Sequence, residues 1–222
     1  AASVPAFKQD DKRLLDWYEH ELEELHVRVK TGTTVTEEAV KAHKPDTVII
    51  ATGSEPIIPD VPGIDNASVT TAIDLLLGKH KAKTHAIVIG GGLVGCETAL
   101  WLAQQGSKVI IIEMLDNLMI GGLPVHHANR TMLIDLLNFN GVTVLTGSTL
   151  AGITDTAVRI VRTDSQMQEI EAATVVIATG LRSNESLHQK INKLVAEAYV
   201  IGDAQKARKI MHSIWDANEV AR

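Results

Sequence analysis

Residues 86–97 read Ala86-Ile87-Val88-Ile89-Gly90-Gly91-Gly92-Leu93-Val94-Gly95-Cys96-Glu97. Apolar strand residues lead directly into glycines spaced G-x-G-x-x-G, and helix-forming residues follow. In such a turn Gly90 allows the sharp exit from the strand, Gly92 lets the main chain approach a pyrophosphate, and Gly95 lets the helix pack closely on the strand. The stretch therefore predicts a dinucleotide-binding turn, with phosphates at the positive end of a helix that begins near Leu93.

The residues after this turn strengthen the prediction. Residues 94–105 have helical character and stop at Gly106, and the apolar strand 108–112 ends at Glu113. Glu113 lies 23 residues after Gly90, where this kind of fold places the carboxylate that binds the adenosine ribose hydroxyls. The alternative, a structural glycine turn beside an incidental glutamate, is disfavoured by this spacing.

The composition is that of an ordinary α/β protein. Of the 222 residues, 45% are hydrophobic and only 3% aromatic, so we expect aliphatic strands buried on both faces. The net charge of −6, without a long Lys/Arg cluster, argues against a nucleic-acid surface. No apolar run approaches the roughly 18 to 20 residues that span a bilayer, and residues 1–10 lack a secretory pattern. We therefore expect a cytoplasmic protein that binds neither nucleic acid nor membrane.

The cysteine and histidine content predicts no metal site or dithiol chemistry. Cys96 is the one cysteine, and a small apolar side chain packs well in the glycine turn, so we expect it to lie in the core. The nine histidines show no metal-ligand spacing, and the adjacent pair His126 and His127 fits a surface position better.

Further helices and strands are expected along the whole chain. The strand-Ala-Thr-Gly pattern occurs twice, ending at Gly53 and at Gly180. Helices are predicted at residues 10–25, 34–42 (with a Thr34-x-x-Glu37 cap), 71–77, 124–139 and 207–221. Strands are predicted at residues 26–30, 47–50, 142–145, 157–162, 168–172, 174–177 and 198–204, the last ending in Gly-Asp.

This order of motifs resembles the flavoprotein reductases with two dinucleotide-binding domains. More narrowly, it is similar to the C-terminal part of the NADH:flavin oxidoreductases related to 2,4-dienoyl-CoA reductase and trimethylamine dehydrogenase. The matching residues are Trp17-Tyr18, residues 48–54 with Pro56 and Pro59, residues 88–97 and residues 199–203. The resemblance implies an α/β fold in which a Rossmann-like three-layer NAD(P)H-binding domain, residues 84–180, is inserted into an incomplete FAD-type Rossmann domain made of residues 1–83 and 181–222.

The resemblance also extends the set of site residues. The expected NAD(H) contacts are Gly90, Gly91, Gly92, Leu93, Val94, Gly95, Glu113, Met114, Ala178, Thr179 and Gly180. The expected FAD contacts in the intact protein are Ala51, Thr52, Gly53, Gly202 and Asp203. Asp203 could instead cap the following helix. Glu97 stands where relatives hold a glutamate near the nicotinamide and flavin, although a helix charge favoured by the dipole is an equal alternative.

Complete members of this family carry an FMN-binding barrel and an iron–sulfur cluster, and neither a barrel nor a cluster's cysteines occur here. The first G-x-G-x-x-G of an FAD domain is also missing, so the chain reads as a fragment.

We expect it to be the NADH-binding module of a flavin-dependent oxidoreductase that passes hydride to FAD, with NADH preferred over NADPH because of Glu113. The alternative is a non-catalytic ADP- or NAD-binding module, whereas a disulfide reductase is disfavoured because it needs a dithiol pair. Unpaired strand edges predict a homodimer through residues 1–60.

Overall fold

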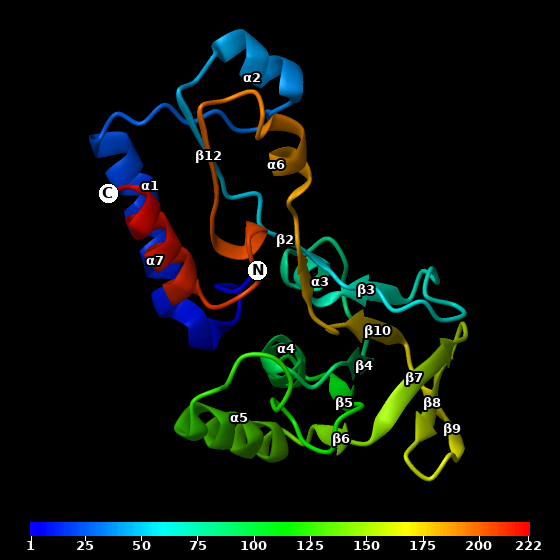
Figure 1. The fold of residues 1–222 in the computed structure, drawn as a ribbon. Coiled ribbons are helices and arrows are strands. Elements are labelled where there is room, and N and C mark those ends of the chain that lie inside the picture. Colours follow the sequence, from blue (N-terminus) through cyan, green and yellow to red (C-terminus); the bar gives the residue numbers. More distant parts are fainter. The chain divides into compact units, whose positions relative to one another are not determined.

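A computed structural model describes all 222 residues, and it has the mixed α/β architecture with a parallel sheet that the sequence predicts (Figure 1). The chain forms two compact units. One contains residues 1–20 and 56–180, and the other contains residues 21–55 and 181–222. No helix combines the length and apolar character needed to cross a bilayer.

A five-stranded parallel sheet forms the centre of the first unit, with the strand order β3-β10-β4-β5-β6. Val88 at the middle of β4 pairs with Val176 on one side and with Ile111 on the other. These central strands are almost wholly buried, as their aliphatic composition predicts. The strands are β3 (Val69–Thr71), β10 (Thr174–Ile177), β4 (His85–Ile89), β5 (Lys108–Ile112) and β6 (Thr143–Leu145).

Two further layers cover the faces of this sheet, because successive side chains of a strand point to opposite faces. Val88 belongs to a core cluster with residues of the helices, and Ile87 to a second cluster with Val158 and Ile160 of an antiparallel sheet. The helices are α3 (Ala72–Leu76), α4 (Leu93–Gln104) and α5 (His127–Phe139), and the antiparallel strands are β7 (Ser148–Ile153), β8 (Ala157–Arg162) and β9 (Met167–Glu171) (Figure 1). This is the expected three-layer arrangement.

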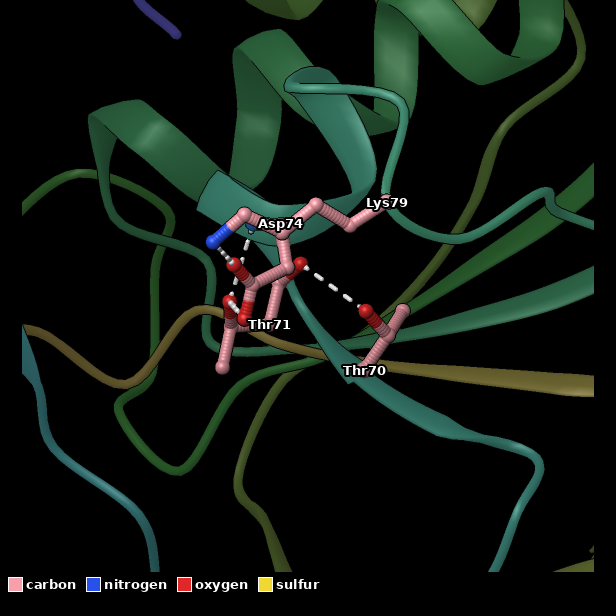
Figure 2. Close-up of polar contacts among 4 residues, drawn as sticks. All are labelled: Thr70, Thr71, Asp74 and Lys79. Carbon is pink, nitrogen blue, oxygen red and sulfur yellow. Dashed lines mark hydrogen bonds and ion pairs between the residues drawn. The ribbon is translucent and has the colours of Figure 1, made fainter. Parts of the chain in front are cut away.

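The junction between β3 and α3 shows how local polar contacts set a helix start (Figure 2). Thr71 Oγ1 accepts a hydrogen bond from the Asp74 backbone N–H and donates one to Asp74 Oδ2, both at 3.0 Å. Lys79 Nζ donates to Asp74 Oδ1 at 2.8 Å, and this bond lowers the pKa of the Asp74 carboxyl. Thr70 Oγ1 donates to the Thr71 carbonyl at 3.4 Å. The helix therefore begins where the sequence predicts it.

The first unit holds more of the chain than the central sheet and its covering layers. Residues 1–20 and 56–83 group with residues 84–180. The reason is packing: β3 pairs with β10, and α3 contacts α4. In addition, Lys8 pairs with Glu97 of α4. Residue 8 belongs to η1 (Ala6–Lys8), which precedes α1 (Gln9–Glu24), a helix that buries none of its residues.

The second unit is built on two parallel strands, β1 (Thr47–Ile50) and β12 (Glu197–Val200), with Ile50 paired to Val200. Helices α2 (Glu37–His43) and α6 (Ser186–Ile191) pack together, and Val40, Ile50 and Ile191 form the small core. The other edge of β1 carries no strand of this chain. The remaining elements are β2 (Ser54–Pro56), which pairs with β11 (Leu181–Ser183), η2 (Gly202–Ala204) and α7 (Ile210–Val220).

Several predicted elements are wrong in detail. Residues 26–30 are irregular instead of a strand, since no neighbouring strand satisfies their backbone groups, and Val27 and Val29 are exposed. Helix α2 is capped by Thr36 instead of Thr34, because Thr36 Oγ1 accepts from the Ala39 N–H at 3.3 Å. Helices α5 and α7 each start three residues later than predicted, and β7 was not predicted.

Candidate nucleotide-binding site

Two glycines of the turn between β4 and α4 are required by packing. Gly90 has φ +108°, and a Cβ there would lie 2.4 Å from the Ala178 carbonyl oxygen. A Cβ on Gly95 would lie 1.9 Å from the Gly90 carbonyl oxygen. Both distances are impossible for a side chain, so these two residues hold the helix against the strands.

Gly92 has no such structural reason to be glycine. Its φ of −70° and ψ of −178° are open to any residue, and a Cβ there would meet no atom within 4 Å. Gly92 is the N-cap of α4, whose first N–H groups have no acceptor within the helix. A side chain would project into the space before the positive end of α4, and its absence fits an anionic group such as a pyrophosphate.

Glu113 at the end of β5 contacts this turn directly. Its side chain is buried; Oε2 accepts a hydrogen bond from the Gly91 N–H at 2.5 Å, and Oε1 accepts from the Leu115 N–H at 2.8 Å. An ionised carboxylate offers about four acceptor sites, so two main-chain bonds leave capacity for ribose hydroxyls. The neighbouring Met114 is 66% exposed. The fold thus brings the acid and the glycine turn together as the spacing predicts.

Arg130 is a residue near this turn that the sequence analysis missed. Its Nε donates to the carbonyl of Leu118 at 3.0 Å, and the next residue, Met119, donates its N–H to the Gly91 carbonyl at 2.8 Å. No motif or spacing in the sequence distinguishes Arg130 from an ordinary surface arginine.

The second Ala-Thr-Gly also lies at the glycine turn, at the end of β10. The Ala178 N–H donates to the Ile89 carbonyl at 2.8 Å. Thr179 Oγ1 donates to the Ile57 carbonyl at 2.7 Å, and the Ile57 N–H donates to the Gly180 carbonyl at 3.0 Å. The Thr179 hydroxyl therefore has a structural partner, and the segment lies beside the turn as expected.

Glu97 and Cys96 in α4 have different surroundings. Glu97 Oε1 lies 2.7 Å from Lys8 Nζ, and both side chains are partly exposed. Cys96 is fully buried and its Sγ donates to the Gly91 carbonyl at 3.3 Å. Burial, with smaller contributions from the Glu113 and Glu97 carboxylates, raises the pKa of the Cys96 thiol to about 12. The thiol is therefore a packing group, as predicted.

The expected FAD contacts meet in the second unit. Residues 51–53 and 202–203 follow the paired ends of β1 and β12, and Gly53 has φ +75° with open space around its Cα. Asp203 Oδ2 accepts from Ser54 Oγ at 3.4 Å, and Oδ1 accepts from the Arg208 N–H at 3.0 Å. The alternative that Asp203 caps the next helix is wrong, because the N-cap of α7 is Lys209.

A cavity of about 900 Å³ adjoins these residues within the second unit. It is lined by residues 33–38 and 49–52 and by Ser186, Leu187 and Lys190. It includes Ala51 and Thr52, so part of the expected FAD site is open. This open space lies beside Ala51 and Thr52, where part of an FAD group is expected. The structure contains no cluster of three or more His, Cys, Asp or Glu side chains that could hold a metal ion.

Residues 38–221 match the protein family described as pyridine nucleotide-disulphide oxidoreductase. The chain is 41% identical to cinnamate reductase of Clostridium sporogenes and 36% identical to NADH oxidase of Thermoanaerobacter brockii, in both cases over 99% of this chain. These matches cover 32% and 34% of the two relatives, so the chain spans about a third of their length.

A solved structure of 2-naphthoyl-CoA reductase superimposes on 97% of this chain and 32% of its own, with a TM-score of 0.90 and 30% identity. The fold also matches 6-hydroxypseudooxynicotine amine oxidase of Pseudomonas geniculata N1 over 98% of this chain and 35% of that chain, with a TM-score of 0.84 and 24% identity.

Proposed function

Because the chain belongs to the pyridine nucleotide-disulphide oxidoreductase family, in which FAD- and NAD(P)-binding domains occur together, we propose that residues 84–180 bind NADH and present it to FAD in the complete protein. The observation that carries this proposal is the combination at the glycine turn. Gly92 leaves open space before α4, and Glu113 stands beside it with acceptor capacity to spare. The Glu113 carboxylate also supports a preference for binding NADH over NADPH, because it would repel the 2′-phosphate of NADPH.

Each group has a distinct task in this proposal. When bound, NADH supplies a hydride and FAD accepts it. The N–H groups at the start of α4 hold the pyrophosphate, Glu113 accepts from the ribose hydroxyls, and Met114 packs against the adenine. Ala178, Thr179 and Gly180 shape the far side of the turn, and Glu97 orients the nicotinamide end. Residues 51–53 and 202–203 bind part of the FAD.

The relatives support an assignment to enoate or dienoyl-CoA reduction. Two of them are named for the reduction of cinnamate and of 2-naphthoyl-CoA, which are an α,β-unsaturated acid and a thioester of an aromatic acid. In our proposal the iron–sulfur cluster of such an enzyme would be bound outside these 222 residues, since this chain contains one cysteine. The FMN-binding barrel would also lie outside them, since the sheets of this chain form no barrel.

A second candidate is a module that binds ADP or NAD without hydride transfer. The pairing of Glu97 with Lys8 favours it, because Glu97 is then engaged within the protein.

Calorimetric titration of this chain with NADH tests the binding proposal. We expect one NADH to bind per chain and ADP-ribose to displace it. No heat of binding at millimolar NADH would contradict it. Anaerobic addition of NADH to the complete protein then separates the two functions, since the flavin absorbance bleaches only if hydride is delivered.

A further inference from the structure

The segment between β5 and α5, residues 113–126, has no regular secondary structure, yet its middle is held tightly. Leu118 and Met119 are only 6% and 5% exposed, and both belong to the core cluster that contains α4 residues. Met119 has φ +56°, a left-handed conformation that a long side chain rarely adopts. Such a conformation persists only where neighbouring contacts maintain it.

Two hydrogen bonds hold the peptide group between Leu118 and Met119, one at its N–H and one at its carbonyl oxygen. The Met119 N–H donates to the Gly91 carbonyl at 2.8 Å, and the Leu118 carbonyl accepts from Arg130 Nε at 3.0 Å. Arg130 lies on α5, a helix of 13 residues that packs against α4. A charged donor on a rigid helix therefore fixes the same peptide that contacts the glycine turn.

The charge of Arg130 also reaches the turn. The pKa of the Cys96 thiol is raised mainly by burial and further by the Glu113 carboxylate, whereas Arg130 acts in the opposite direction. Because both charges act on one buried thiol, Arg130 and Glu113 lie in the same electrostatic neighbourhood.

We propose that Arg130 is a positioning residue that fixes residues 113–119 against the glycine turn and thereby sets the affinity for the adenosine half of a nicotinamide nucleotide. This inference rests on the proposed nucleotide site. Arg130 acts through the Leu118 carbonyl and the Met119–Gly91 hydrogen bond on the orientation of Glu113. Without its donor, the left-handed Met119 relaxes, and Glu113 no longer presents one fixed orientation to the ribose hydroxyls.

The chain offers a matched pair of arginines for the test. Arg130→Met keeps an unbranched apolar stem and removes the donor, and Arg130→Lys keeps a charged donor of similar reach. Arg159→Met is the control, since Arg159 Nε also donates at 3.0 Å, but to the exposed Glu169 carboxylate in the antiparallel sheet. Arg130→Leu, which also lacks a donor, replaces Arg130→Met if the latter does not fold.

Calorimetric titrations with NADH, NADPH and ADP-ribose give the first readout. We expect Arg130→Met to weaken NADH and ADP-ribose binding about tenfold, which is the effect of one hydrogen bond to a charged donor. The difference between the NADH and NADPH affinities should also become smaller. Arg130→Lys should recover most of the affinity, and Arg159→Met should behave as wild type. Hydrogen exchange gives the second readout: the Met119 amide should exchange faster in Arg130→Met, while the amides of β4 remain unchanged.

Three results would overturn the inference. A folded Arg130→Met or Arg130→Leu chain with the wild-type NADH affinity and the wild-type ratio of NADH to NADPH affinity would show that Arg130 does not position the site. An equal loss of NADH affinity in Arg159→Met would show that the effect comes from the change in net charge and not from the position of Arg130. A wild-type chain that binds none of the three nucleotides would refute the proposed function and this inference with it.

Discussion

Replacing Gly92 by Val should abolish nucleotide binding and leave the fold intact. The backbone at Gly92 is extended, and a Cβ there meets no atom within 4 Å, so neither the backbone conformation nor the first side-chain atom is a source of strain. Losing glycine at an N-cap costs roughly 0.5 to 1 kcal/mol, and the smaller entropy of the unfolded chain returns about the same amount. The melting temperature should therefore stay within about 4 °C of wild type.

The effect on binding is much larger than the effect on folding. A pyrophosphate at the start of α4 would accept at least two main-chain hydrogen bonds, each worth about 1.5 to 3 kcal/mol when one partner is charged. A valine side chain in that space displaces the phosphates and breaks both bonds. The expected loss is about 3 kcal/mol or more, which is at least a 100-fold increase in the NADH dissociation constant.

Isothermal titration calorimetry and circular dichroism should be run on the same preparations. Gly152→Ala is the matched control, because a Cβ at Gly152 would have only an ordinary contact of 3.5 Å with the Pro62 carbonyl oxygen. Gly95→Ala should unfold or rearrange the turn, since its Cβ would lie 1.9 Å from the Gly90 carbonyl oxygen. Unchanged NADH affinity in folded Gly92→Val would refute this placement of the site, and loss of far-UV signal would show that Gly92 is principally structural.

Three further predictions address specificity, the buried thiol and self-association. Calorimetry should show NADH binding at least about tenfold more tightly than NADPH, since Glu113 would repel a 2′-phosphate, and Glu113→Gln should narrow the difference; tighter NADPH binding by wild type would contradict this. Ellman's reagent at pH 8 should label Cys96 only after denaturation, and rapid labelling of the folded chain would refute its burial. Burial raises the pKa of the Cys96 thiol from 9.0 to about 12, so the folded state keeps a proton that the unfolded state loses above pH 9.0. Stability relative to Cys96→Ala, measured by urea unfolding, should therefore fall by about 1.4 kcal/mol per pH unit between those values, and a pH-independent difference would contradict it. Light scattering should give the mass of a dimer, which we expect to form through residues 1–60 because β1 has one edge without a partner strand and its Ile49 is 49% exposed. The Ile49→Lys variant should be monomeric. A monomeric wild-type chain at high concentration would rule this out.

The elements of the first unit could be predicted because their sequence patterns and their tertiary contacts agree. The β4 strand, the glycine turn, α4 and β5 each carry a local signal, and the same residues become the centre of the core. Glu113 could be placed at the turn from spacing alone, since parallel neighbouring strands end at the same edge of a sheet.

The failures have a different physical origin. Residues 26–30 alternate like a strand, but alternation without a neighbouring strand leaves the backbone unpaired. Strand β7 escaped prediction because its register shifts between Leu150 and Gly152, which interrupts the alternation. Arg130 could not be found because its role depends on a contact with the carbonyl of Leu118, and a main-chain acceptor leaves no trace in the sequence.

The two main-chain hydrogen bonds of Glu113 have an evolutionary consequence. The carboxylate that would discriminate between nucleotides is also the acceptor for the Gly91 and Leu115 N–H groups. A lineage that exchanges this acid for a small neutral residue to admit a 2′-phosphate leaves the buried Gly91 donor without its acceptor, at a cost of about 1 to 3 kcal/mol. A substitution of Glu113 that changes the coenzyme preference therefore also lowers the stability of the fold. We expect it to require a second substitution that supplies a new acceptor, so that drift toward NADPH passes through a less stable intermediate.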